Sequence, residues 1–318
     1  MHKQEYINGI LSGDRVILGK AITLTESTLD SDQLLAEEIL EACMSEKRSS
    51  HRIAISGSPG VGKSTFIEKL GLSYVEQGSK VAVLAIDPSS QSSGGSILGD
   101  RTRMEKLSAS DHAFIRPSPA AEQLGGVAGK TRETILLCEA AGFDKVIVET
   151  VGVGQSEIAA SKMTDVFLLL VLAGAGDELQ GIKRGIMELA DFVIVNKADG
   201  DNIKNATKAR RSYVNAIHMF PPKENGEKVE VLAVSSINGD GFDDLISKLE
   251  AFFTNTEKSG ALQKDRRSQQ KDWLEDAIKS EIAKKYSALN KKEIADLLEQ
   301  ISEGKMHPAK AARMLLKK

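Results

Sequence analysis

The sequence predicts an α/β fold, in which a mostly parallel β-sheet has helices on both faces and helical extensions at the N- and C-terminal ends. Two observations carry this prediction. Between residues 49 and 256, short β-branched and apolar runs alternate with segments of helical periodicity. These runs are apolar at nearly every position, which is typical of strands buried on both faces. We therefore divide the chain into a helical extension (1–48), a central domain (49–256) and a C-terminal helical arm (257–318).

The composition excludes several classes of protein. A chain of 318 residues, with 41% hydrophobic and 27% charged residues, is long enough to bury a full core. A net charge of −3 and 4% aromatic residues argue against a nucleic-acid partner. The longest apolar run, 166–176, is shorter than the roughly 20 residues of a membrane helix, so we expect no membrane contact. Two cysteines and no leader pattern lead us to expect a cytoplasmic protein.

The N-terminal extension shows helical periodicity. Ile7, Ile10 and Leu11 share one face of a first helix. We expect a second helix, capped by Asp30 or Ser31, whose apolar face consists of Leu34, Leu35, Ile39 and Leu40.

Six strands are expected in the central domain. Polar or glycine-rich segments follow most of them, and in parallel sheets ligands bind at the carboxyl ends of the strands. The strands are predicted at 52–56, 81–86, 145–148, 166–172, 192–195 and 229–234.

The C-terminal arm begins after a polar linker predicted at 255–260. Gly304 and Pro308 delimit a last short helix. Two apolar stripes precede it: Leu274, Ile278, Ile282 and Tyr286, then Ile294, Leu297, Leu298 and Ile301. The arm is too short to form a core of its own, so we expect it to pack on the central domain or on another subunit.

The segment after the first predicted strand matches the phosphate-binding pattern G-x-x-x-x-G-K-[ST]. A helical pattern follows it, so both flanks have the required context. Its glycines let backbone N–H groups surround phosphates at a helix N-terminus. We expect Lys63 to contact the β- and γ-phosphates and the Ser64 hydroxyl to ligate Mg²⁺. The expected phosphate-binding residues are Gly57, Ser58, Pro59, Gly60, Val61, Gly62, Lys63, Ser64 and Thr65.

Acidic residues near the ends of later strands complete the expected Mg²⁺ site. Asp87 follows the second strand, Asp100 closes a glycine-rich loop, and Glu149 ends the third strand. A turn role for Asp87 and a plain loop role for Asp100 are the alternatives. The N–H of Gly152 can donate to the γ-phosphate. Because Val153 stands where Ras-like GTPases carry a water-positioning Gln, we expect Glu149 to orient the attacking water.

The pattern N-K-x-D indicates which base is bound. Asn196, Lys197 and Asp199 follow the fifth predicted strand, downstream of the phosphate-binding segment. A carboxylate can accept two hydrogen bonds from guanine, whereas adenine lacks the amino group that supplies the second. The sequence therefore predicts GTP and GDP as ligands. After the last strand, Ser235, Ser236 and Ile237 can offer N–H groups to the base, and an ordinary turn is the alternative.

These motifs, with the segments 87–90, 94–100, 149–157 and 173–183, resemble the MeaB/ArgK family, the GTPases associated with methylmalonyl-CoA mutase. The resemblance covers nearly the whole chain. It implies a SIMIBI-type P-loop NTPase fold, with 49–256 as the GTPase domain and 257–318 as a dimerisation arm. It also implies a homodimeric GTPase chaperone of an adenosylcobalamin-dependent mutase, which aids cofactor loading and protects the mutase from inactivation.

The resemblance further implies a third switch segment. Its charged and polar members are Asp177, Glu178, Gln180 and Lys183, and a solvated loop is the alternative. For function, the alternative is a P-loop kinase or ATPase linked to lysine, arginine and ornithine transport. The residues that read the base argue against ATP, and beyond Glu149 and Asp87 nothing in the sequence suggests a base for a phosphate acceptor.

Overall fold

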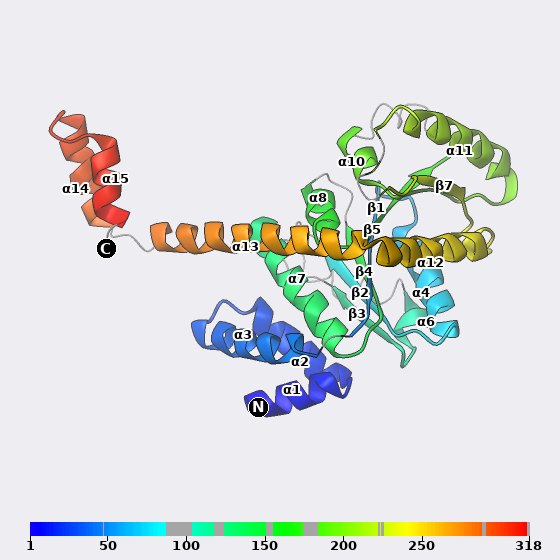
Figure 1. Cartoon of the computed structure of the whole chain (residues 1–318), viewed down its shortest axis with the longest axis horizontal. Helices are drawn as coiled ribbons and strands as arrows, with labels where there is room; N and C mark the ends of the chain where they lie inside the picture. The colour runs from blue at the N-terminus through cyan, green and yellow to red at the C-terminus, as the bar shows by residue number, and fades with distance from the viewer. Residues whose placement is uncertain are drawn as a thin grey trace. The chain divides into compact units, whose positions relative to one another are not determined.

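The central sheet has the parallel α/β architecture that the sequence predicts. In the computed structural model, which describes residues 1–46, 48–86, 104–117, 124–150, 155–173, 184–221, 223, 226–287 and 291–316, all the strand pairings are parallel. The strand order is β3-β2-β4-β1-β5-β6-β7 (Figure 1). The strands are β1 (His51–Gly57), β2 (Val81–Ile86), β3 (Ala113–Pro117), β4 (Lys145–Thr150), β5 (Val166–Leu172), β6 (Phe192–Asn196) and β7 (Glu230–Ala233).

The strands are apolar at successive positions because the sheet separates two hydrophobic cores. On β1, Ile53 and Ile55 face one core and Ala54 faces the other, as the alternation of a strand requires. The first core lies under α4 (Lys63–Glu76), α6 (Glu105–Ser108) and α12 (Phe242–Ser259). The second lies under α1 (Lys3–Leu11), α2 (Arg15–Glu26), α3 (Asp30–Met44), α7 (Leu124–Ala140), α8 (Gln155–Ser161), α10 (Arg184–Leu189) and α11 (Ile203–Ile217). Figure 1 shows α7 and α8 on one side of the sheet and α4 and α6 on the other.

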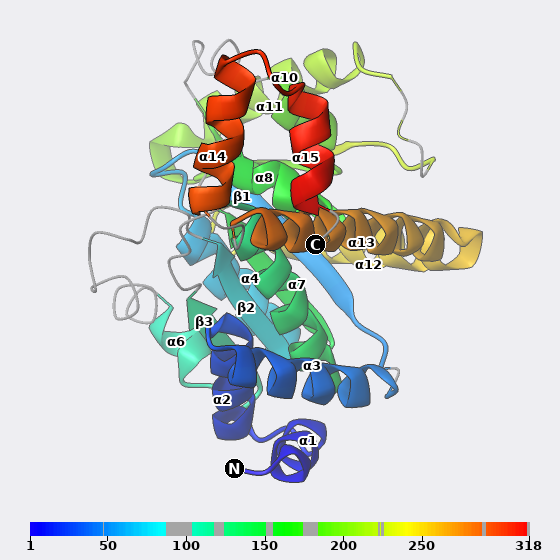
Figure 2. The same cartoon turned by 90° about the vertical axis from the view of Figure 1, so that its left-hand side faces the viewer.

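The N-terminal extension differs from the prediction in its number of helices. It forms three helices, and Figure 2 shows α2 and α3 beside α7. The carboxylate of Asp14 accepts hydrogen bonds from Val16 N and Ile17 N, so α2 has its own N-cap. The predicted cap of the following helix is wrong, because Leu29 occupies the N-cap of α3 and no side chain caps it. Leu34, placed on the apolar face, is 62% exposed.

Strand β3 is absent from the sequence prediction. It is a short strand at the edge of the sheet, paired with β2. Its last two residues are the polar Arg116 and Pro117, which has no backbone N–H to donate, so the apolar run is too short to indicate a strand in the sequence.

The linker predicted before the C-terminal arm also differs from the structure. The polar linker expected at 255–260 is helical to Ser259, because the last turns of α12 bury Phe252, Phe253 and Thr256. Gly260 (φ 75°) ends α12 in the left-handed region, and α13 (Ala261–Ser287) follows directly.

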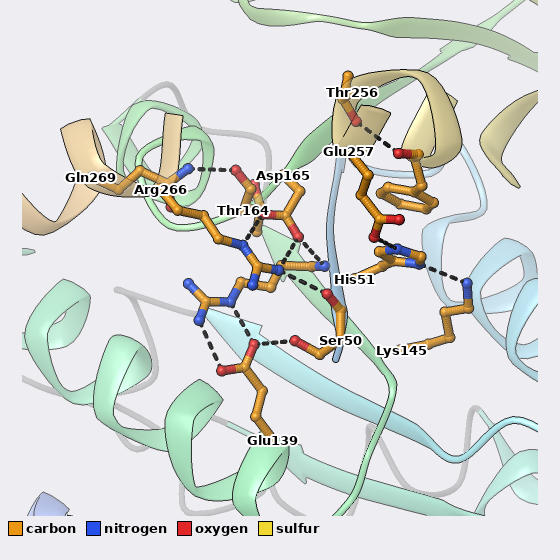
Figure 3. A network of polar contacts seen from close by, with 12 residues as sticks. Ser50, His51, Glu139, Lys145, Thr164, Asp165, Thr256, Glu257, Arg266 and Gln269 are labelled. Carbon is orange, nitrogen blue, oxygen red and sulfur yellow. Dashed lines mark hydrogen bonds and ion pairs between the residues drawn. The ribbon is translucent and has the colours of Figure 1, made fainter. Parts of the chain in front are cut away.

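The first turns of α13 are held to the amino ends of the strands (Figure 3). The Arg266 guanidinium donates two hydrogen bonds to the buried carboxylate of Asp165, at 2.8 and 2.7 Å, and a third to Ser50 O at 2.8 Å. Gln269 Nε2 donates to Thr164 O at 2.7 Å. A bidentate Arg–carboxylate pair fixes orientation as well as distance, so residues 261–269 belong to the same unit as the sheet.

A second contact at this end of the sheet involves the first residue of β1. The His51 ring stacks on Phe253 of α12, with 3.8 Å between ring centroids (Figure 3). Its Nδ1 lies 2.9 Å from Lys145 Nζ and its Nε2 lies 3.0 Å from Glu257 Oε1. Because an ammonium can only donate, His51 Nδ1 is the acceptor and Nε2–H donates to Glu257.

Residues 270–318 form a second compact unit. It contains the rest of α13, α14 (Lys291–Ser302) and α15 (Pro308–Leu316), and α14 and α15 form a helical hairpin (Figure 2). Gly304, with φ 71°, lies between them, as the sequence predicts. Leu297 of α14 and Ala311 of α15 are buried. None of the helices in the described ranges is long and apolar enough to cross a membrane.

Candidate functional site

The phosphate-binding segment joins the end of β1 to the start of α4. At Gly57, a Cβ would lie 2.5 Å from Leu170 O of β5, so only glycine fits beside the neighbouring strand. Gly62 (φ 93°) is the N-cap of α4, and no side chain caps this helix. The first N–H groups of α4 therefore remain available to an anion, at the end of the helix that carries partial positive charge.

Lys63, the first residue of α4, points back over the loop. Its Nζ donates to Gly57 O at 2.8 Å and approaches Ser58 O at 3.5 Å. Burial lowers the pKa of the Lys63 ammonium, and the carboxylates of Glu149 and Glu157 oppose this shift. The ammonium thus lies against carbonyl oxygens of this loop and near two acidic side chains.

Two of the four groups expected to hold Mg²⁺ lie in the described ranges. Ser64 is in the first turn of α4, and Glu149 is the penultimate residue of β4. Ile55 of β1 is opposite Glu149 in the parallel pairing. Glu149 therefore lies at the carboxyl ends of the strands, beside the start of the phosphate-binding segment (the P-loop). Hydroxyl and carboxylate oxygens suit Mg²⁺. No group of three or more His, Cys, Asp or Glu side chains in the described ranges forms a metal site by itself.

Several predicted site residues lie outside the described residues. They are Asp87 and Asp100 of the expected Mg²⁺ site, Gly152 of the γ-phosphate contact, and Asp177, Glu178, Gln180 and Lys183 of the expected switch segment.

The residues expected to read the base are held by hydrogen bonds between two loops. The Ser235 hydroxyl donates to Asp199 Oδ2 at 2.6 Å, and the Ser236 hydroxyl donates to Asn196 Oδ1 at 2.7 Å. Lys197 is in the left-handed region (φ 57°), the one such non-glycine residue in the described ranges. Such a backbone costs on the order of 1–3 kcal/mol and is typical of functional sites.

The loop that contains Ser235 uses several of its N–H groups internally. Ser235 N donates to Asp240 O, Asn238 N to Ser235 Oγ and Gly239 N to Ser235 O. This restricts the expected contact with a base to the N–H groups of Ser236 and Ile237. The Ile237 side chain is 77% exposed.

The base-reading motif contacts the P-loop directly. Asn196 Nδ2 donates to Val61 O at 2.8 Å, and Lys197 Nζ donates to Gly60 O at 2.8 Å. A Cβ at Gly62 would lie 3.0 Å from Asn196 Nδ2, so glycine permits this close approach. The structure thus brings together the two motifs that the sequence separates by more than 130 residues.

The sequence analysis missed Glu157 as a residue of this region. It is on α8, its side chain is buried, and it contacts both Ser56 at the end of β1 and Thr150 at the end of β4. Glu157 follows Glu149 within one of the segments that carry the family resemblance. Its acidic character and its place in that segment are the signal that the sequence offers, and they do not reveal its partners.

Comparisons with known proteins agree with this geometry. A family model described as methylmalonyl Co-A mutase-associated GTPase MeaB matches residues 18–291. The chain is 45% identical to GTPase ArgK of Escherichia coli, over 87% of this chain and 84% of ArgK. It is 40% identical to the mitochondrial methylmalonic aciduria type A homolog of Mus musculus, over 97% of this chain and 77% of the relative.

A solved structure is similar along the whole chain. It is described as the crystal structure of an LAO/AO transport system kinase, and it superposes with a TM-score of 0.77 at 36% identity. The match covers 99% of this chain and 96% of the other.

Proposed function

Because this chain belongs to the MeaB family of methylmalonyl-CoA mutase-associated GTPases, we propose that it is a GTP-hydrolysing chaperone of an adenosylcobalamin-dependent mutase of the methylmalonyl-CoA type. In this role its nucleotide state gates loading of the cofactor and protects the mutase from inactivation. The family description supports this partner, and so does the mouse relative, whose name refers to methylmalonic aciduria. A cytoplasmic location is part of the proposal.

One observation carries the nucleotide half of the proposal. Asn196 and Lys197, of the motif that we expect to read the base, donate hydrogen bonds to carbonyl oxygens of the phosphate-binding loop. A nucleotide that spans this contact is read at both ends. The chain is a GTPase by its family, and this geometry is what a guanine nucleotide site needs.

The same residues support a mechanism for hydrolysis. The P-loop N–H groups and Lys63 neutralise the β- and γ-phosphate oxygens, and the Glu149 carboxylate orients the attacking water. The water oxygen forms a bond to the γ-phosphorus and the bond between that phosphorus and the bridging oxygen breaks. GDP leaves with the bridging oxygen, and the protons of the water leave with the phosphate. Ser64, Glu149, Asp87 and Asp100 would hold Mg²⁺, which would supply further neutralisation of charge on the phosphates.

The partner half of the proposal is tested by hydrolysis with and without the mutase. We expect purified methylmalonyl-CoA mutase to stimulate GTP hydrolysis, with all the γ-phosphate label recovered as free phosphate. Lys183→Ala should leave GTP affinity nearly unchanged and abolish the stimulation. Coupling between sites is typically about 5- to 150-fold, so its loss is measurable. Stimulation that persists in Lys183→Ala, with the mutase still bound, would favour the alternative that the expected switch residues belong to a solvated loop.

The same assay separates the proposal from the kinase alternative. Transfer of label to lysine, arginine, ornithine or a protein acceptor would support a kinase. Recovery of free phosphate alone supports the GTPase with no acceptor substrate.

A homodimer is also part of the proposal, and the apolar stripe of α13 supports it. The stripe consists of Leu274, Ile278, Ile282 and Tyr286, which are 62%, 50%, 57% and 64% exposed. Four large apolar side chains at four-residue spacing on one helix face are typical of a surface that another subunit covers.

We expect the double variant Ile278→Asp/Ile282→Asp to convert the dimer to a monomer. Two carboxylates in an apolar interface lose their hydration without gaining partners, which is strongly unfavourable. Light scattering gives the oligomeric mass. Ser280→Asp, which places a carboxylate on the opposite, exposed face of the same helix, is the matched control. A double variant with the mass of the parent would show that the stripe is not the dimer interface.

A further inference from the structure

Glu157 is a fully buried acidic residue that accepts hydrogen bonds from three hydroxyl groups. Its side chain is on α8, and the residue is 0% exposed. Oε1 accepts from Ser56 Oγ and from Thr150 Oγ1, each at 3.2 Å, and Oε2 accepts from Ser156 Oγ at 3.2 Å. A carboxylate is costly to bury unless hydrogen bonds satisfy it, so these contacts explain why it is tolerated. Each of these bonds, at 3.2 Å, is longer than the usual O–H···O distance.

The two donors to Oε1 lie at corresponding positions of neighbouring strands. Ser56 directly precedes Gly57 of the P-loop, and Thr150 directly follows Glu149. Because Ile55 is opposite Glu149 in the parallel pairing, Ser56 and Thr150 are next to each other across the sheet. One carboxylate oxygen therefore joins the two strands at the point where one leads into the phosphate-binding loop and the other ends beside the proposed catalytic carboxylate.

The charge of Glu157 also reaches the site. The carboxylates of Glu157 and Glu149 both act on the Lys63 ammonium and oppose the lowering of its pKa by burial. Glu157 therefore lies near the site without lining the phosphate-binding loop itself.

We propose that Glu157 is a positioning residue for GTP hydrolysis, which acts through the hydroxyls of Ser56 and Thr150 to hold Glu149 at a fixed separation from the P-loop. The inference rests on the proposed role of Glu149 in orienting the attacking water. Binding of the nucleotide depends mainly on the P-loop backbone and the base-reading loop. Loss of the hydrogen bonds from Ser56 and Thr150 to Glu157 should therefore lower kcat more than nucleotide affinity. Misplacing a reacting group lowers the rate without removing a binding contact.

The test is a double-mutant cycle on the full chain. Thr150→Val keeps the shape of the side chain and removes the hydroxyl, and Glu157→Ala removes the acceptor. We expect each to lower kcat by roughly tenfold, with GDP affinity within about twofold of the parent. The double variant should be no slower than Glu157→Ala, because both changes remove the hydrogen bond between Thr150 and Glu157. Glu157→Gln keeps Oε1 as an acceptor and should stay within about threefold of the parent kcat.

The matched control is Thr164→Val. The Thr164 hydroxyl is also buried and donates to Ala160 O at 2.8 Å, but it lies at the amino end of β5. We expect this variant to lower Tm and leave kcat unchanged. If Glu157→Ala does not fold, Thr150→Val and Glu157→Gln still decide the question.

Three results would overturn the inference. They are losses in kcat that multiply in the double variant, a fall in GDP affinity that parallels the fall in kcat, and a Glu157→Gln protein as slow as Glu157→Ala. A Glu149→Ala protein that hydrolyses GTP at the parent rate would instead contradict the proposed role of Glu149. The two failures are therefore distinguishable.

Discussion

A Glu149→Ala protein should bind GTP and hydrolyse it at least about 10²-fold more slowly than the parent, which is the usual effect of removing one positioning or electrostatic group. Glu149 is half-buried at the end of β4, beside the strand that leads into the P-loop, and its charge acts on Lys63. Its loss removes the proposed water-orienting group and one expected Mg²⁺ ligand, whereas the P-loop backbone that binds phosphates is unchanged.

Single-turnover hydrolysis and GDP affinity should be measured together, because the prediction is a fall in kcat with nucleotide still bound. Glu188→Ala removes an exposed carboxylate on α10 and serves as the control with parent kinetics. A parent rate in Glu149→Ala would assign water activation to another group.

An Asp199→Asn protein should lose a few kcal/mol of GTP binding energy and gain affinity for xanthine nucleotides, because an amide presents a donor where guanine also presents donors. The structure strengthens this expectation. The Ser235 hydroxyl already donates to Asp199 Oδ2 at 2.6 Å, and this bond fixes the orientation of the carboxylate through one of its two oxygens. The amide that replaces this carboxylate would have only one oxygen to accept hydrogen bonds from both the Ser235 hydroxyl and the purine.

Binding of GDP, XDP and ADP to the parent and to Asp199→Asn measures this change. Asp201→Asn, an exposed Asp two residues further along the chain, is the matched control and should bind as the parent does. Equal affinity of the parent for GDP and ADP would remove the guanine assignment altogether.

The fold could be predicted from the sequence where local pattern and tertiary burial agree. Strands β2 and β5 occupy the predicted residues, because runs such as 81–86 and 166–172 are buried on both faces of the sheet. The prediction failed where local chemistry decided the outcome. Asp14 begins a helix of its own, and β3 is hidden by Arg116 and Pro117 at the edge of the sheet.

The candidate site divides in the same way. The residues of the P-loop and of the base-reading motif are recognisable in sequence, because their spacing is set by the backbone geometry that binds phosphate or a base. Glu157 is not recognisable, because its donors Ser56 and Thr150 come from two strands that the chain order separates. Only the pairing of β1 with β4 brings them together.

The bonds from Asn196 and Lys197 to the P-loop carbonyls have a consequence for how affinity is distributed over the ligand. Because these bonds join the two loops, a ligand bound to one loop influences the conformation of the other. Guanosine and pyrophosphate added as separate molecules would therefore not bind independently. Their binding free energies are then not additive, and the intact nucleotide gains from the connection between its two ends. We therefore expect a change at Gly60 or Val61 to alter the discrimination between purines, although neither residue belongs to the motif expected to contact the base.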